Sequence, residues 1–156
     1  MGFNTYYWGP RLWEVLHVIS FDYPIKPTLK EKEDMKNFLL GLRNVLPCIY
    51  CRKNYARNIN EMPIKLNCRK DLVLWLIDLH NEVNGKEGKR HYTYEEVLKE
   101  YEKKLGKQIL LTGNDNSILK LGKTCDKHCW NMVNISIIII IVILVLFFIQ
   151  KKYNIL

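Results

Sequence analysis

The chain has 156 residues, of which 48% are hydrophobic and 26% charged, and its net charge is +8. This length suits one domain with a short appendage, and five cysteines are too few for a small scaffold held together by disulfides. The lysines are scattered and form no basic helix or aromatic-basic motif, so we expect no nucleic-acid partner.

Helical periodicity begins near the N-terminus. The spacing of apolar residues predicts a helix from about Pro10, a favourable first helical position, to about Phe21. Its apolar stripe is Leu12, Val15, Leu16 and Ile19. Prolines interrupt the chain at 24 and 27, and Thr28 with Glu31 then forms a capping box that opens a second helix. The apolar face of this second helix is Met35, Phe38, Leu39, Leu42 and Val45.

A third, short helix follows Pro47, which ends the second helix and can start the next. It would carry Cys48 and Cys51 in its first turn and present Tyr55 and Ile59 on its inner side. A fourth helix is predicted from about residue 69, with Gly85 as its stop. Its apolar stripe is Leu72, Leu76, Leu79 and Val83.

A second capping box, Thr93 with Glu96, opens a fifth helix that ends at Gly106. Residues 1–106 are therefore predicted to be all-α, a four-helix bundle with a short fifth helix. Residues 107–129 are expected to be a flexible arm that includes Cys125 and Cys129.

Residues 130–150 are predicted to be a transmembrane helix, followed by a short tail, 151–156. Residues 137–149 contain no polar side chain, and a helix needs about 20 apolar residues to cross a bilayer. Three lysines precede the span and two follow it, which slightly favours the N-terminal domain on the cytosolic side. We therefore expect a membrane protein with one C-terminal span.

The cysteines of Cys48-Ile49-Tyr50-Cys51 are the main candidates for chemistry. By itself this spacing is compatible with a redox dithiol, half of a zinc site or chance. At a helix N-terminus, unpaired N–H groups and the helix dipole favour the thiolate and lower the pKa of the first cysteine. No strand pattern precedes the motif, which excludes a thioredoxin-like fold. A helical redox protein needs another electron acceptor, and a flavin is the obvious one.

Two further segments accompany this motif: W-G-P-x-x-W-x-x-L-H from Trp8 to His17, and H-N-E-V-N from His80 to Asn84. Over roughly residues 8–101 the chain resembles Erv/ALR-type FAD-dependent sulfhydryl oxidases. Its cysteine set resembles that of members encoded by large cytoplasmic DNA viruses, which implies a viral protein of the host cytoplasm and the virion membrane.

The resemblance implies that the bundle encloses FAD and that Cys48 and Cys51 are catalytic, with Cys51 on the flavin side. Electrons would pass from a thioredoxin-like or other dithiol protein to O₂, giving H₂O₂. Dimers are common in the family, so a homodimer is a further expectation. The expected cofactor contacts are Gly9, Arg11, Trp13, His17, Tyr23, Tyr55, His80, Asn81, Val83, Asn84, Lys86 and Lys89.

The remaining cysteines carry several alternatives. Cys125 and Cys129 match the shuttle pair of relatives, but they could be palmitoylated, or could join Cys48 and Cys51 around zinc. Cys68 is expected to be a buried, inert thiol rather than part of an intersubunit disulfide.

A structural disulfide that is frequent in the family is missing, because Ile77 and Tyr94 occupy its positions. Packing, the flavin or a partner subunit would have to supply that stability. The rival interpretations of the whole chain are a non-enzymatic, membrane-anchored helical interaction module and a zinc-binding module.

Overall fold

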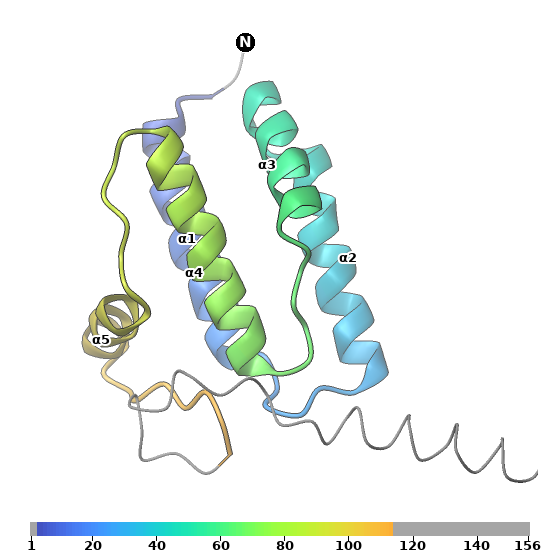
Figure 1. The fold of residues 1–156 in the computed structure, drawn as a ribbon, viewed down its shortest axis with the longest axis vertical. Helices are drawn as coiled ribbons and strands as arrows, with labels where there is room; N and C mark the ends of the chain where they lie inside the picture. Colours follow the sequence, from blue (N-terminus) through green and yellow to red (C-terminus); the bar gives the residue numbers. More distant parts are fainter. Residues whose placement is uncertain (1–2, 114–156) are drawn as a thin grey trace, which may run out of the picture. The chain divides into compact units, whose positions relative to one another are not determined.

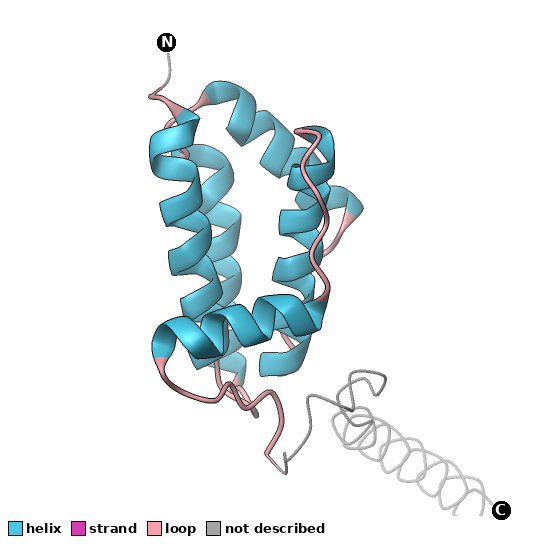
Figure 2. Ribbon diagram, turned by 90° about the vertical axis from the view of Figure 1, so that its left-hand side faces the viewer, coloured by secondary structure: helices cyan, strands magenta, loops and turns pink. Residues whose placement is uncertain are grey.

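The computed structural model describes residues 3–113, and all the regular secondary structure among these residues is helical (Figures 1 and 2). The elements are α1 (Thr5–Asp22), α2 (Leu29–Val45), α3 (Ile49–Glu61), α4 (Arg69–Lys86) and α5 (Tyr94–Leu105). The all-α prediction, with a short fifth helix after the first four, is confirmed.

The two predicted capping boxes are both present. The Thr28 hydroxyl accepts from the Glu31 N–H at the start of α2, and Thr93 does the same for Glu96 at the start of α5. In each case the glutamate carboxylate accepts in return from the backbone N–H of the threonine. At the end of α5, Gly106 adopts φ +62°, the left-handed conformation that closes helices most readily when the residue is glycine.

The predicted start of α1 was wrong, because the helix begins five residues before Pro10. Asn4 is the N-cap, and its side chain accepts a hydrogen bond from the Tyr6 N–H at 2.9 Å. Pro10 lies inside the helix, where it cannot donate to the carbonyl four residues earlier. The cap at Asn4 is a local signal that outweighs the preference of proline for the first helical position.

The predicted end of α4 was also wrong. Gly85 is helical, and the left-handed glycine beyond the helix is Gly88, with φ +68°. A Cβ on Gly85 would lie 2.7 Å from Nε2 of His91. Gly85 therefore serves a close approach between α4 and the segment that follows it, rather than a helix stop.

The first four helices form two closely packed pairs, α1 with α4 and α2 with α3, and α5 lies crosswise against α4 (Figures 1 and 2). Side chains join the two pairs. Indole Nε1 of Trp75 on α4 donates at 2.9 Å to the carbonyl of Met62, the C-cap residue of α3, and Nζ of Lys86 donates to Oδ1 of Asn58 at 2.7 Å. These hydrogen bonds, together with an apolar cluster whose members come from all four helices, link the two pairs.

One cluster of buried side chains occupies the centre of the bundle and another lies under α5. Leucines from α1, α2 and α4 supply much of the first, as the apolar stripes predicted. Three predicted inward residues are exposed: Val15 at 54%, Phe38 at 42% and Val45 at 71%. They lie at the edges of their stripes, where a helix of period 3.6 turns toward solvent.

Packing replaces the missing family disulfide between α4 and α5. Ile77 is 1% exposed in the cluster under α5, and Tyr94 packs against that cluster. The Tyr94 hydroxyl donates to Oδ1 of Asp78 at 2.6 Å. The two positions that would carry the cysteines thus form an apolar contact and a charge-assisted hydrogen bond instead.

The predicted transmembrane helix (130–150) and most of the predicted arm (107–129) lie outside the described residues. Within 3–113, no helix combines the length and apolar character needed to cross a membrane.

Candidate functional site

Trp13, His17 and His80 come together where α1 and α4 face each other. Nε2 of His17 and Nδ1 of His80 are 3.1 Å apart and share a hydrogen bond. The indole of Trp13 stacks on His80, with ring centroids 4.1 Å apart and planes 7° apart. Two of the expected cofactor contacts, His17 and His80, thus lie together although they come from different helices.

Both histidines are held in the neutral form. Burial, and then the neighbouring His80, lowers the pKa of His17 from 6.5 to about 3. Burial, and then the charge of Lys89, lowers the pKa of His80 to about 4. Nδ1 of His17 is buried and has no hydrogen-bond partner among residues 3–113. Nδ1 of His17 is therefore free to hydrogen-bond to a ligand beside the stacked rings of Trp13 and His80.

The dithiol lies at the N-terminus of α3. Cys48 is the N-cap rather than part of the first turn, and its Sγ accepts a hydrogen bond from the Cys51 N–H at 3.2 Å. Cys51 is in the first turn, as predicted, and packs against the central core cluster that Trp13 also contacts. Both cysteines are free thiols.

The two thiols differ in acidity. A hydrogen bond from the Cys51 thiol, backbone N–H groups and the charge of Arg52 lower the pKa of Cys48, as its helix-terminal position led us to expect. Burial, and then the Cys48 thiol, raises the pKa of Cys51 to about 11. Cys48 is therefore the more acidic thiol of the reduced pair, and the Cys51 thiol donates a hydrogen bond to it.

Arg52 was not among the residues that the sequence singled out. Its Nε donates to the Leu46 carbonyl at 2.8 Å, which holds the guanidinium next to the Cys48 thiol. Its position directly after the C-x-x-C motif was the sequence signal that could have predicted a positive charge near the dithiol.

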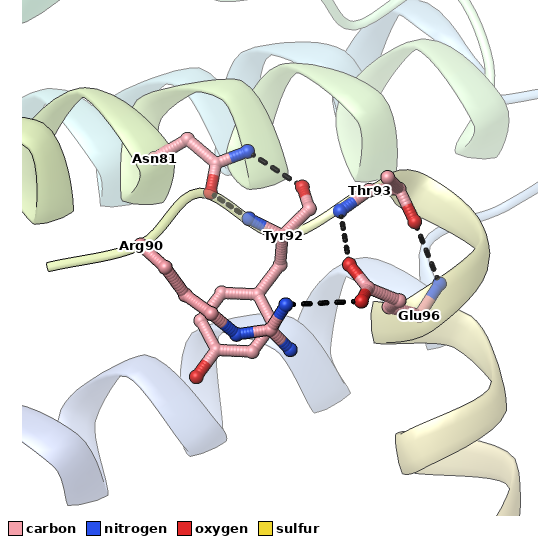
Figure 3. Close-up of polar contacts among 5 residues, drawn as sticks. All are labelled: Asn81, Arg90, Tyr92, Thr93 and Glu96. Carbon is pink, nitrogen blue, oxygen red and sulfur yellow. Dashed lines mark hydrogen bonds and ion pairs between the residues drawn. The ribbon is translucent and has the colours of Figure 1, made fainter.

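Asn81 ties α4 to the segment that leads into α5 (Figure 3). Its Nδ2 donates to the Tyr92 carbonyl at 2.8 Å, and its Oδ1 accepts from the Tyr92 N–H at 2.9 Å. Arg90 stacks over the Tyr92 ring, 4.0 Å from its centroid, and pairs with Glu96 at 3.0 Å. With both groups of its amide engaged, Asn81 fixes residues 87–93 against α4.

Two lysines among the expected cofactor contacts, Lys86 and Lys89, lie at and just beyond the end of α4. Lys86 pairs with Glu82 at 2.7 Å and donates to Asn58, and Lys89 pairs with Glu87. The backbone N–H of Lys89 donates to the carbonyl of Asn84, a residue that is 6% exposed. Both lysine side chains are partly exposed, and each is paired with a glutamate.

The remaining expected cofactor contacts make other interactions, although Tyr23 and Tyr55 belong to the core cluster that Trp13 and Cys51 contact. The Tyr23 hydroxyl donates to the Leu66 carbonyl, and the Tyr55 hydroxyl donates to the Leu39 carbonyl at 3.0 Å. Arg11 is exposed, with its guanidinium over the Tyr7 ring and hydrogen-bonded to the Tyr7 carbonyl. Gly9 and Val83 are half-buried.

The other cysteines divide by location. Cys68 is 7% exposed, as expected, but it is disulfide-bonded, which corrects the prediction of an inert thiol. Cys125 and Cys129 lie outside the described residues. Among residues 3–113, no group of three or more potential ligand side chains could hold a metal ion.

These side chains fit the FAD that the sequence resemblance implies. A stacked aromatic pair suits a planar ring, two lysines suit a pyrophosphate, and two buried polar atoms, Nδ1 of His17 and Nδ2 of Asn58, lack partners in the described part of the chain. Binding a planar ring and a pyrophosphate through these groups requires no metal-ligating side chains.

Comparison with known proteins finds relatives over most of the described part of the chain. A model of the Erv1 / Alr family matches residues 10–103. The chain is 42% identical over 101 residues to a probable FAD-linked sulfhydryl oxidase of Acanthamoeba polyphaga mimivirus, covering 63% of this chain and 71% of that protein. It is 30% identical to an FAD-linked sulfhydryl oxidase of African swine fever virus, covering 66% and 87%. A crystal structure of the FAD-binding domain of Erv1 from Saccharomyces cerevisiae superposes with a TM-score of 0.56 at 31% identity, covering 62% of this chain and 88% of that one.

The depressed pKa of His17 predicts a loss of stability in mild acid. The unfolded chain takes up a proton at its ordinary pKa of 6.5, whereas the folded chain resists protonation down to about 3. Lowering the pH from 6.5 to 5 should therefore cost about 2 kcal/mol at this residue. Urea unfolding across this range measures this loss together with a similar one from His80, whose pKa is lowered to about 4, so His17→Gln should remove about half of the total.

The matched control is His91→Gln, which changes an exposed histidine. An unchanged pH dependence in His17→Gln would contradict a buried, neutral ring.

Proposed function

Because the chain belongs to the Erv1 / Alr family, we propose that it is an FAD-linked sulfhydryl oxidase that makes disulfides in dithiol proteins and passes the electrons to O₂ as H₂O₂. The observation that carries this proposal is the unequal dithiol at the start of α3. Cys48 is the acidic thiol, and Cys51 packs against the same core cluster as Trp13.

In the oxidised enzyme, Cys48 and Cys51 would be joined by a disulfide. A substrate thiolate attacks Sγ of Cys48, which forms a mixed disulfide and releases Cys51 as a thiolate. The second thiolate of the substrate then attacks the substrate sulfur of this mixed disulfide, which closes the substrate disulfide and releases Cys48 as a thiolate. The lowered pKa of Cys48 makes it a good leaving group, and the substrate departs as a disulfide, leaving two electrons on the dithiol.

Cys51 would be the cysteine that faces the cofactor. Its thiolate is disfavoured by burial and is therefore strongly nucleophilic when exchange at Cys48 releases it. FAD, when bound, supplies a two-electron acceptor that O₂ can reoxidise. We propose that Trp13, His17 and His80 would hold its planar part, while Lys86 and Lys89 would balance its phosphate charge.

Asn81, Asn84 and the residues around them would shape this pocket from α4. Tyr23, Tyr55, Gly9, Arg11 and Val83 stay proposals by resemblance. The hydroxyls of the two tyrosines already hold backbone carbonyls, so any contact with FAD would be made by their rings.

Cys51→Ser should abolish dithiol-dependent O₂ uptake while FAD stays bound, because the change removes the sulfur and leaves the packing nearly intact. O₂ consumption with dithiothreitol and the flavin absorbance near 450 nm measure the two properties on one sample. Turnover comparable with that of the unmodified protein would contradict the assignment of Cys51.

We further propose that Cys125 and Cys129 form a shuttle disulfide between protein substrates and Cys48. Changing both to serine should slow oxidation of a thioredoxin-like protein by about 10-fold or more, while oxidation of dithiothreitol, which reaches Cys48 unaided, changes little. Equal rates on both substrates would leave the pair as lipidation sites or bystanders. Equal losses on both would indicate a structural role.

We also propose that residues 130–150 anchor the enzyme in a membrane, with its oxidase domain in the cytosol. We propose further that it is a viral enzyme that reaches the virion membrane and that it works as a homodimer. The apolar run 137–149 supports the anchor. In cells, the full chain should stay in the membrane pellet after alkaline extraction, whereas a chain lacking 130–150 should be released. Release of the full chain would contradict the anchor.

A further inference from the structure

Asn58 is a polar residue in the middle of the bundle that the proposed function has not yet used. It lies on α3 and is 1% exposed. Its Oδ1 accepts a hydrogen bond from Nζ of Lys86 at 2.7 Å, so the amide orientation is fixed with Nδ2 pointing away from the ammonium group. Nδ2 is buried and has no acceptor among residues 3–113.

A buried amide with an unused N–H₂ group is costly. Leaving one buried donor unpaired costs about 1–3 kcal/mol, and nearly all buried polar groups in native proteins have partners. An apolar side chain would avoid this cost. A ligand that brings an acceptor to Nδ2 would account for an asparagine at this position.

The position of Asn58 relates it to the redox pair and to the lysine end of α4. Cys51, Tyr55 and Asn58 are spaced i, i+4 and i+7, so they share one face of α3. On that face Cys51 packs against the core, while Asn58 reaches across to Lys86 on α4. Asn58 therefore lies between the two groups that the oxidase reaction needs, the dithiol and the cation that balances the cofactor's phosphates.

We propose that Asn58 is an FAD-binding residue, whose Nδ2 donates a hydrogen bond to an acceptor oxygen or nitrogen of the cofactor while its Oδ1 holds Lys86 in place. This inference rests on the proposed function, since it assigns a further contact within the same site. The bound cofactor supplies the acceptor that residues 3–113 do not offer to Nδ2, so Asn58 favours the loaded state over the empty one.

Two substitutions separate the donor from the anchor for Lys86. Asn58→Asp keeps an oxygen for Lys86 but replaces the donor with a second acceptor. Asn58→Ala removes both the donor and the acceptor. It is introduced into Lys86→Met, where no ammonium group remains to be anchored, and the double variant is compared with Lys86→Met alone. The matched controls are Asn60→Asp and Asn60→Ala, which change an exposed asparagine on the same helix.

The affinity for FAD is measured by titrating the apoprotein and following flavin fluorescence, with circular dichroism to verify folding. We expect Asn58→Asp to weaken FAD binding by about 10-fold or more, which is about 1.4 kcal/mol. Asn58→Ala should weaken it by a similar factor even in the Lys86→Met background, and the Asn60 variants should bind as the unmodified chain does.

Wild-type affinity in Asn58→Asp would overturn the inference and leave Asn58 as an anchor for Lys86 alone. So would the absence of any further loss when Asn58→Ala is added to Lys86→Met. If Asn58→Asp does not fold, the Lys86→Met pair decides. Failure of the unmodified chain itself to bind FAD would instead contradict the proposed function.

Discussion

The hydrogen bond between His17 and His80 determines how α1 and α4 lie against each other. Both rings are withdrawn from water, so both must stay uncharged, and two neutral imidazoles can share only one proton between the facing nitrogens. That bond fixes the plane of His80, and the plane of His80 fixes where Trp13 can stack. A flat, neutral aromatic surface is therefore built into the most closely packed helix pair of the bundle.

The second helix pair supplies the opposite electrostatic environment. The first turn of α3 points its N–H groups at Cys48, and Arg52 adds a positive charge, so this end of the site favours an anion. The two environments are joined through the shared apolar core and through the Lys86 bridge to Asn58. Neutral rings on one pair and an acidic thiol on the other are what a cofactor-linked dithiol needs: a surface for a planar ring and a sulfur that exchanges readily.

Features that depend on neighbouring residues in the chain could be predicted from the sequence, and features that depend on distant ones could not. The capping boxes at Thr28 and Thr93 and the stop at Gly106 were predictable because their partners lie within a few residues. Gly85 was misassigned because its role depends on His91, which the chain brings back against α4. Asn58 was missed because a lone asparagine on a short helix usually faces water, and only the arrangement of α3 against α4 buries it. The resemblance named His17 and His80 as cofactor contacts, but the hydrogen bond between them could not be predicted, since neither spacing nor periodicity relates residues 63 positions apart.

The joint between α4 and α5, meaning the contact between these helices, is stabilised by the packing of Ile77, by the Tyr94–Asp78 hydrogen bond and by the two hydrogen bonds between the Asn81 side chain and the Tyr92 backbone. None of these contacts involves sulfur, so thiol reductants have nothing to cleave there and a newly made chain needs no oxidant to close it. An enzyme that makes disulfide bonds thus needs no disulfide bond to hold α5 against α4. It also keeps this joint out of the exchange reactions that its active-site sulfurs must undergo at every turnover.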